Sequence, residues 1–156
     1  MTTDRSLFED RIEMLLAERG WPSVESEAFK KMDKHQQRMA SLFVLENEVA
    51  GGGFSRAYFN QDLELGVIAA DAYEAIGAKE HAQVVRQSVE AAKKQAASEK
   101  ASMTSGSLVT MSEEHIKSGY AAVDKAWAAI SGIDTSTKKY DYMKQHSVSF
   151  GIVLNK

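Results

Sequence analysis

The chain has 156 residues and a formal net charge of −3, with 44% apolar residues, one proline and no cysteine. This length and apolar content predict one folded domain, residues 1–156, and argue against a disordered chain. The lack of cysteine excludes a disulfide scaffold, a thiolate zinc site and a cysteine nucleophile.

Apolar residues at helical spacing predict the first elements. The pattern over residues 5–19 predicts a helix that Gly20 and Pro22 end. A second helical region runs from about residue 23 or 26 to residue 50, and its polar stretch KKMDKHQQR is a candidate break between two helices. Three consecutive glycines, 51–53, then interrupt the pattern.

The glycine run is interpreted as a structural turn rather than as a ligand loop. A phosphate-binding loop needs a lysine followed by serine or threonine, and GGGFSR supplies an aromatic residue instead. We therefore expect Gly52 or Gly53 to have a positive φ, at the end of one helix and before a short helix over residues 54–60. The turn would direct three aromatic residues inward: Phe54, Tyr58 and Phe59. Asn60 would end the short helix.

Two further helices follow. The first covers residues 63–76, ends at Gly77, and should bury Leu63, Val67, Ala70, Tyr73 and either Ile68 or Ile76. The second, over residues 79–101, is polar and should lie on the surface with a narrow inward stripe of Ala82, Val85, Val89, Ala92 and Ala96.

The last third of the chain begins with a predicted loop, SMTSGSLVT. Thr110 and Glu113 fit a capping box that opens a helix over about 111–131, which carries Ile116, Tyr120, Val123, Trp127 and Ile130 at helical spacing. A short helix over 136–146 should follow. The final stretch SVSFGIVLNK alternates like a strand, but it is expected to form an extended tail over the core because the chain offers no partner strand.

These elements predict an all-α fold: a single-domain irregular bundle of about six to eight helices with an extended C-terminal tail. No apolar run approaches the roughly 20 residues that cross a bilayer, so no membrane contact is expected. The first ten residues, MTTDRSLFED, place acidic residues where a signal peptide needs an apolar core, which indicates a cytoplasmic protein.

Catalytic and metal-binding patterns are weak. The histidines His35, His81, His115 and His146 have no i, i+4 spacing and are expected to be scattered surface residues. Asp71 and Glu74 share one side of a helix, but acid–base catalysis also needs a buried pocket that separates their pKa values. Trp21 and Trp127 are expected to pack in the core or at helix ends. We therefore predict no enzyme activity, no metal and no cofactor.

Charge is distributed unevenly along the chain. Residues 46–92 contain three basic and eight acidic residues, a net charge of −5, and residues 93–156 carry +3. An acidic region would repel phosphates, which argues against direct nucleic-acid binding and permits a basic protein partner. The alternative is a solvated helical surface without a partner.

The stretch LENEVAGGGFSRAYFN, followed by AYEAIGA, resembles a family of small, all-helical bacterial proteins that includes the DNA-mimic protein described from Neisseria. The resemblance covers about residues 42–92 and, more loosely, 110–131, so the family-like core is about 42–131. The matching positions are Glu46 or Glu48, Gly52, Gly53, Phe54, Tyr58, Phe59, Asn60, Ala72, Ile76, Gly77 and Ala78, with Asp124 and Trp127 in a weaker match. Gly51 stands where the family pattern has asparagine.

The resemblance implies a protein-binding module, with an acidic helical surface that occupies a basic groove of a partner such as a DNA-binding regulator or a nuclease toxin. The candidate contact residues are Asp62, Glu64, Asp71, Glu74 and Glu80. Two alternatives stay open: a toxin-neutralising immunity protein of the same fold, and a helical oligomerisation module in which the stripe over 82–96 joins a second copy as a homodimer.

Overall fold

The computed structural model describes residues 4–18, 23, 26–104 and 113–151. Within these ranges the chain forms seven α-helices and one 3-10 helix, and no strand, which confirms the predicted all-α class. The elements are α1 (Asp4–Glu18), α2 (Glu27–Lys30), α3 (Lys34–Asn60), α4 (Glu64–Ala75), α5 (Lys79–Thr104), α6 (Glu113–Ala129), α7 (Ser136–Gln145) and the 3-10 helix η1 (Ser147–Phe150).

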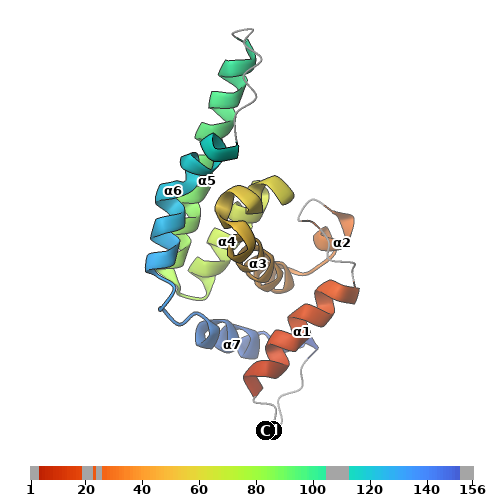
Figure 1. Ribbon diagram of the computed structural model, residues 1–156. Coiled ribbons are helices and arrows are strands. Elements are labelled where there is room, and N and C mark those ends of the chain that lie inside the picture. The colour runs from red at the N-terminus through yellow and green to blue at the C-terminus, as the bar shows by residue number, and fades with distance from the viewer. Residues whose placement is uncertain (1–3, 19–22, 24–25, 105–112, 152–156) are drawn as a thin grey trace.

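Helix α3 runs through the middle of the molecule (Figure 1). On one side, α4 packs against both α3 and α5, and α6 packs along α5. On the other side, α1 and η1 contact α3, while α7 contacts α1. The α5–α6 pair is antiparallel and extends beyond the remaining helices (Figure 1). The largest fully buried apolar side chains come from α3 itself and from the elements on both of its sides: Leu16, Leu42, Leu45, Phe54, Leu65, Tyr73, Val85 and Phe150.

The predicted break within residues 23–50 is confirmed. Asp33 precedes α3 in an extended conformation, and its carboxylate accepts a hydrogen bond from the Gln36 amide at 2.9 Å. The Gln36 side chain accepts one in return from the Asp33 amide at 3.0 Å. This capping box satisfies two amides that have no partner inside a helix, so α3 begins at residue 34 rather than continuing from α2.

Helix α4 ends as predicted, but its inward side is shifted. Gly77 has φ 79°, and the Ala78 amide donates to the Tyr73 carbonyl at 2.8 Å, the pattern of a left-handed helix end. Val67, predicted to be buried, is 48% exposed. Because α4 packs on α3 and α5 at once, the buried set is broader than a single stripe and consists mostly of small residues: Leu65, Gly66, Ala69, Ala70, Ala72 and Tyr73.

The stripe predicted on α5 is confirmed for Ala82, Val85, Val89 and Ala92, which are buried, but Ala96 is exposed. Helix α5 extends to Thr104, so the first three residues of the predicted loop SMTSGSLVT are helical. The rest of that loop and Thr110 of the expected capping box lie outside the described residues. The helices predicted over 111–131 and 136–146 correspond to α6 and α7.

The C-terminal segment was expected to be extended, and over residues 147–150 this expectation is wrong. These residues form the 3-10 helix η1, with Phe150 buried and Val148 92% exposed. Arg11 of α1 donates to the Phe150 carbonyl at 2.8 Å, and Gln36 of α3 donates to the Ser149 carbonyl at 2.7 Å. Two side chains thus donate hydrogen bonds to these backbone carbonyls. In a β-strand, the same carbonyls would have needed a neighbouring strand as donor. Residues 152–156 are not described.

Among the described helices, none combines enough length with enough apolar character to cross a bilayer.

Candidate functional site

The three glycines form a kink within α3, and the carboxylate of Asp124 in α6 binds at that kink. Gly53 has φ 75°, and the helix resumes at Phe54. The Phe54 amide donates to Asp124 Oδ1 at 2.9 Å. An amide at the start of a helix has no partner within the helix, so Asp124 acts as a cap supplied by another helix. A β-carbon on Gly53 would lie 2.8 Å from Asp124 Oδ2, so glycine is required here by space as well as by φ.

The expectation of a positive φ at Gly52 or Gly53 is therefore confirmed at Gly53. Phe54 is fully buried, as predicted, and its ring packs edge-on against Trp127 at 5.5 Å between centroids. Tyr58 is partly buried, and its hydroxyl lies 2.6 Å from the Ser88 hydroxyl. Burial raises the pKa of Tyr58 to about 12.

Phe59 does not pack inward, and the sequence-based expectation for it is wrong. Its side chain is 91% exposed. Tyr58 lies four residues after Phe54, about one helical turn, and so shares its side of the helix. Phe59 lies five residues after Phe54, which turns it by about 140° from that side. Only two of the three predicted aromatic residues can face the same core.

A cluster of polar side chains joins the two parts of α3 across the kink. Asn60 donates to Glu48 Oε2 at 2.8 Å, and Arg56 Nε donates to the same oxygen at 3.3 Å. The Arg56 guanidinium also donates to the Gly51 carbonyl at 3.1 Å. Asn60 is thus the last residue of α3 and also holds Glu48, twelve residues earlier, in place. Glu48 and Asn60 both belong to the motif on which the family resemblance was based.

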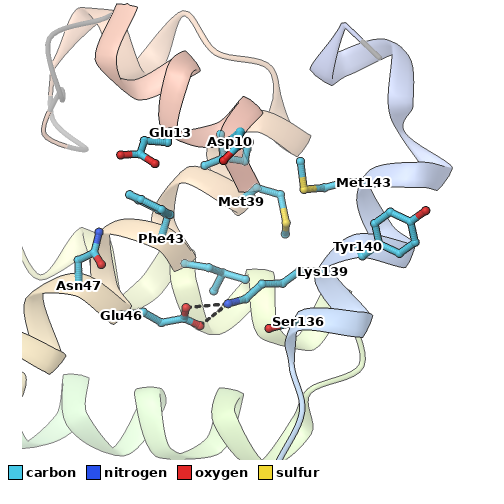
Figure 2. A pocket seen from close by; sticks show the side chains of 12 residues that line it. Asp10, Glu13, Met39, Phe43, Glu46, Asn47, Ser136, Lys139, Tyr140 and Met143 are labelled. Carbon is cyan, nitrogen blue, oxygen red and sulfur yellow. Dashed lines mark hydrogen bonds and ion pairs between the residues drawn. The ribbon is translucent and has the colours of Figure 1, made fainter. Parts of the chain in front are cut away.

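Glu46 forms a second polar centre, which sequence reasoning missed. Its carboxylate accepts hydrogen bonds from Lys139 Nζ at 2.6 and 2.7 Å (Figure 2). It also accepts one from the Tyr73 hydroxyl at 2.6 Å. Burial and the nearby Glu46 charge raise the pKa of Tyr73 well above its ordinary value, so Tyr73 stays a donor. This centre joins α3, α4 and α7, and no local pattern pairs residues 46 and 139.

The expectation of scattered surface histidines is wrong for the three whose side chains the structure describes. His81 is 5% exposed and packs edge-on against Trp127, with 5.3 Å between ring centroids. Burial lowers the pKa of His81. His35 and His146 stack at 3.6 Å although 111 positions separate them, and burial together with His146 lowers the pKa of His35. His115 and Trp21 lie outside the described side chains, whereas Trp127 packs in the core as expected.

All five carboxylates of the predicted contact surface are exposed. Asp62 and Glu64 lie at the start of α4, Asp71 and Glu74 lie further along it, and Glu80 lies in the first turn of α5. Two of them are already paired: Asp71 with Arg38 at 3.1 Å and Glu74 with Arg86 at 3.2 Å. The surface is therefore less negative than the count of its acidic residues suggests.

The fold and these polar centres define a small helical protein with a capped central kink. No group of three or more histidine and acidic side chains in the described part could hold a metal ion. The family model of DMP19-like proteins, named for DNA mimic protein 19, matches residues 30–146, about three quarters of the chain. The chain belongs to the DMP19-like family. No curated protein and no solved structure matches it.

Substitution of Gly53 tests the kink, and Gly77 provides a matched control. Both glycines have a positive φ, but Gly53 combines it with ψ −174°, a conformation that essentially only glycine adopts. A β-carbon on Gly77 would also meet nothing within 4 Å. We expect Gly77→Ala to cost about 1–2 kcal/mol of unfolding free energy and Gly53→Ala to cost about 1–3 kcal/mol more, because of this backbone conformation and because it crowds Asp124. Chemical denaturation of both variants measures the difference.

The part of the cost at Gly53 that comes from crowding should disappear when Asp124 is shortened. In an Asp124→Ala background we expect Gly53→Ala to cost about 1 kcal/mol less than in the native background, while the cost of Gly77→Ala should not change. An unchanged cost of Gly53→Ala in the two backgrounds would contradict the crowding and leave the backbone conformation of Gly53, φ 75° and ψ −174°, as its cause.

The raised pKa of Tyr58 predicts a loss of stability in alkali. The unfolded chain ionises a tyrosine near pH 10, whereas native Tyr58 does so near pH 12. The unfolded state therefore releases this proton first, and the stabilisation is complete below about pH 10 and lost between about pH 10 and 12. Tyr58→Phe should remove its contribution, about 2–3 kcal/mol across that window. Urea denaturation of both proteins at several pH values checks this, and parallel pH profiles would contradict it.

Proposed function

We propose that this protein is a DNA-mimic type protein-binding module whose acidic surface on α4 and the start of α5 occupies a basic, DNA-binding groove of a partner. Membership of the DMP19-like family carries this proposal. In the part of the chain that the structure describes, no arrangement of residues points to an enzymatic reaction, so we propose a binding role without catalysis. The proposed partner is a cytoplasmic DNA-binding regulator or a nuclease.

The arrangement of the carboxylates supports the proposal. Carboxylates held along helices present negative charge at fixed positions, as phosphates do along a nucleic acid, and they accelerate association with a basic groove. The side chains of Asp62, Glu64 and Glu80 are exposed, and neither Glu64 nor Glu80 forms an ion pair with an arginine or lysine of the described residues. We assign most of the attraction to these three residues.

The two paired carboxylates have different roles. The Arg86 side chain is 55% exposed, so its pair with Glu74 contributes little stability and can be exchanged for a partner's cation. Arg38 is only 15% exposed and also donates to the Tyr142 hydroxyl at 3.0 Å. Asp71 is therefore held by an arginine that the fold itself uses, and we expect it to contribute less to partner binding than Glu74.

Neutralisation of Asp62, Glu64 and Glu80 tests the surface. The triple variant Asp62→Asn, Glu64→Gln and Glu80→Gln keeps the shape of each side chain, including the hydrogen bond that Asp62 accepts from the Leu63 amide. A matched control removes three acidic charges elsewhere: Glu18→Gln, Glu27→Gln and Asp141→Asn. Each full-length protein is used to capture partners from a lysate of the source cell, and captured proteins are identified by mass spectrometry.

We expect the native protein and the control to retain a basic DNA-binding protein that the triple variant loses. Binding of the purified partner should weaken at least about tenfold as salt rises from about 50 to about 200 mM, and the partner's own DNA should displace the chain. A partner that binds the chain and DNA together, or that binds all three proteins equally, contradicts the mimicry.

A further inference from the structure

A pocket of about 340 Å³ lies between α1, α3 and α7 (Figure 2). Its floor consists of buried apolar side chains: Ile12 from α1, Met39 and Leu42 from α3, and Met143 from α7. The half-buried ring of Phe43 lies beside them. The volume is at the lower end of the range for ligand pockets, and methionine side chains adapt to the shape of what they contact.

The pocket combines this apolar floor with excess negative charge. Asp10 and Glu13 come from α1, are exposed, and have no ion-pair partner among the described residues. Glu46 and Lys139 also line the pocket, but they neutralise each other through the hydrogen bonds described above. The remaining charge is −2, and it lies next to apolar side chains.

Helix α1 supplies these two carboxylates, and it lies outside the family match, which begins at residue 30. The acidic surface of the proposed function belongs to α4 and α5, whereas this pocket is formed by α1, α3 and α7. The pocket is thus a separate site, and its acidic side comes from a part of the chain that the family match does not include.

We propose that this pocket binds an arginine side chain of a protein partner. The aliphatic part of arginine would lie on Met39 and Met143, and its guanidinium would reach Asp10 and Glu13. Arginine fits better than lysine, because its planar group is less strongly hydrated, donates two parallel hydrogen bonds to a carboxylate and stacks on aromatic rings such as Phe43. The site does not depend on DNA mimicry.

A blocked amino acid, N-acetyl-arginine methylamide, is the probe. The full chain is labelled at its methionine methyl groups, and the signals of Met39 and Met143 are followed by NMR as the probe is added. We expect both signals to shift and to saturate, with a Kd on the order of millimolar for a single side chain. The citrulline analogue has the same shape without the charge and should shift them at least about tenfold less. The lysine analogue should bind more weakly than arginine.

Two sets of variants separate this site from the proposed function. Asp10→Asn with Glu13→Gln should weaken binding of the arginine probe about tenfold. Both residues are exposed, so the melting curve should not change. The triple variant Asp62→Asn, Glu64→Gln and Glu80→Gln should bind the probe as the native chain does, even if it loses the lysate partner. If the native chain does not respond to the probe while the triple variant still loses the lysate partner, the pocket assignment alone fails. If the probe response is intact while the triple variant keeps the lysate partner, the acidic-surface proposal alone fails.

Three results would overturn the assignment. The first is no saturable shift of Met39 and Met143 up to the solubility limit of the arginine probe. The second is an equal response to the citrulline analogue, which would make the site apolar only. The third is tighter binding of agmatine than of the blocked arginine by tenfold or more, which would assign the pocket to a free small molecule with an amine and a guanidinium group instead of a protein side chain.

Discussion

The hydrogen bond from the Phe54 amide to Asp124 determines the direction of the chain at the centre of the molecule. It joins the middle of α3 to α6, two segments that are 70 positions apart. The bond forms only because Gly53 has no β-carbon and accepts a left-handed φ, so the carboxylate can approach the backbone. The ring contact between Phe54 and Trp127, three residues after Asp124, then continues the same interface with apolar packing.

The kink divides α3 into two parts that serve different faces of the protein. The part before the glycines supplies Met39, Leu42, Phe43 and Glu46 to the pocket with α1 and α7. The part after them carries Phe54 and Tyr58 against α5 and α6, and leads directly into α4, where the acidic surface begins. A straight α3 would turn Phe54 away from Trp127 and displace α4, so both candidate sites depend on the same three glycines.

Local patterns predicted most of the fold, because helix starts and ends depend on neighbouring residues. The break before α3, the kink at Gly53 and the end of α4 at Gly77 follow from capping and left-handed residues that the sequence displays. The short segment after the kink was harder, since seven residues make too few turns to show which side faces inward, and Phe59 was placed wrongly. The polar centres could not be predicted: Glu46 with Lys139, and His35 with His146, meet only after distant helices have packed.

The acidic surface shows why net charge is a poor guide to mimicry in this chain. The formal net charge of −3 includes ion pairs of different kinds. The pair of Glu74 with Arg86 is exposed, so water screens it and a partner's cation can replace Arg86. The pair of Glu46 with Lys139 is partly buried and joins helices of the fold. A partner interacts electrostatically with the carboxylates that are exposed and are not held in ion pairs within the fold. Their number is small, so affinity for a basic groove must come from their fixed spacing along α4 and α5 more than from total charge, because rigid helices lose little conformational entropy on binding.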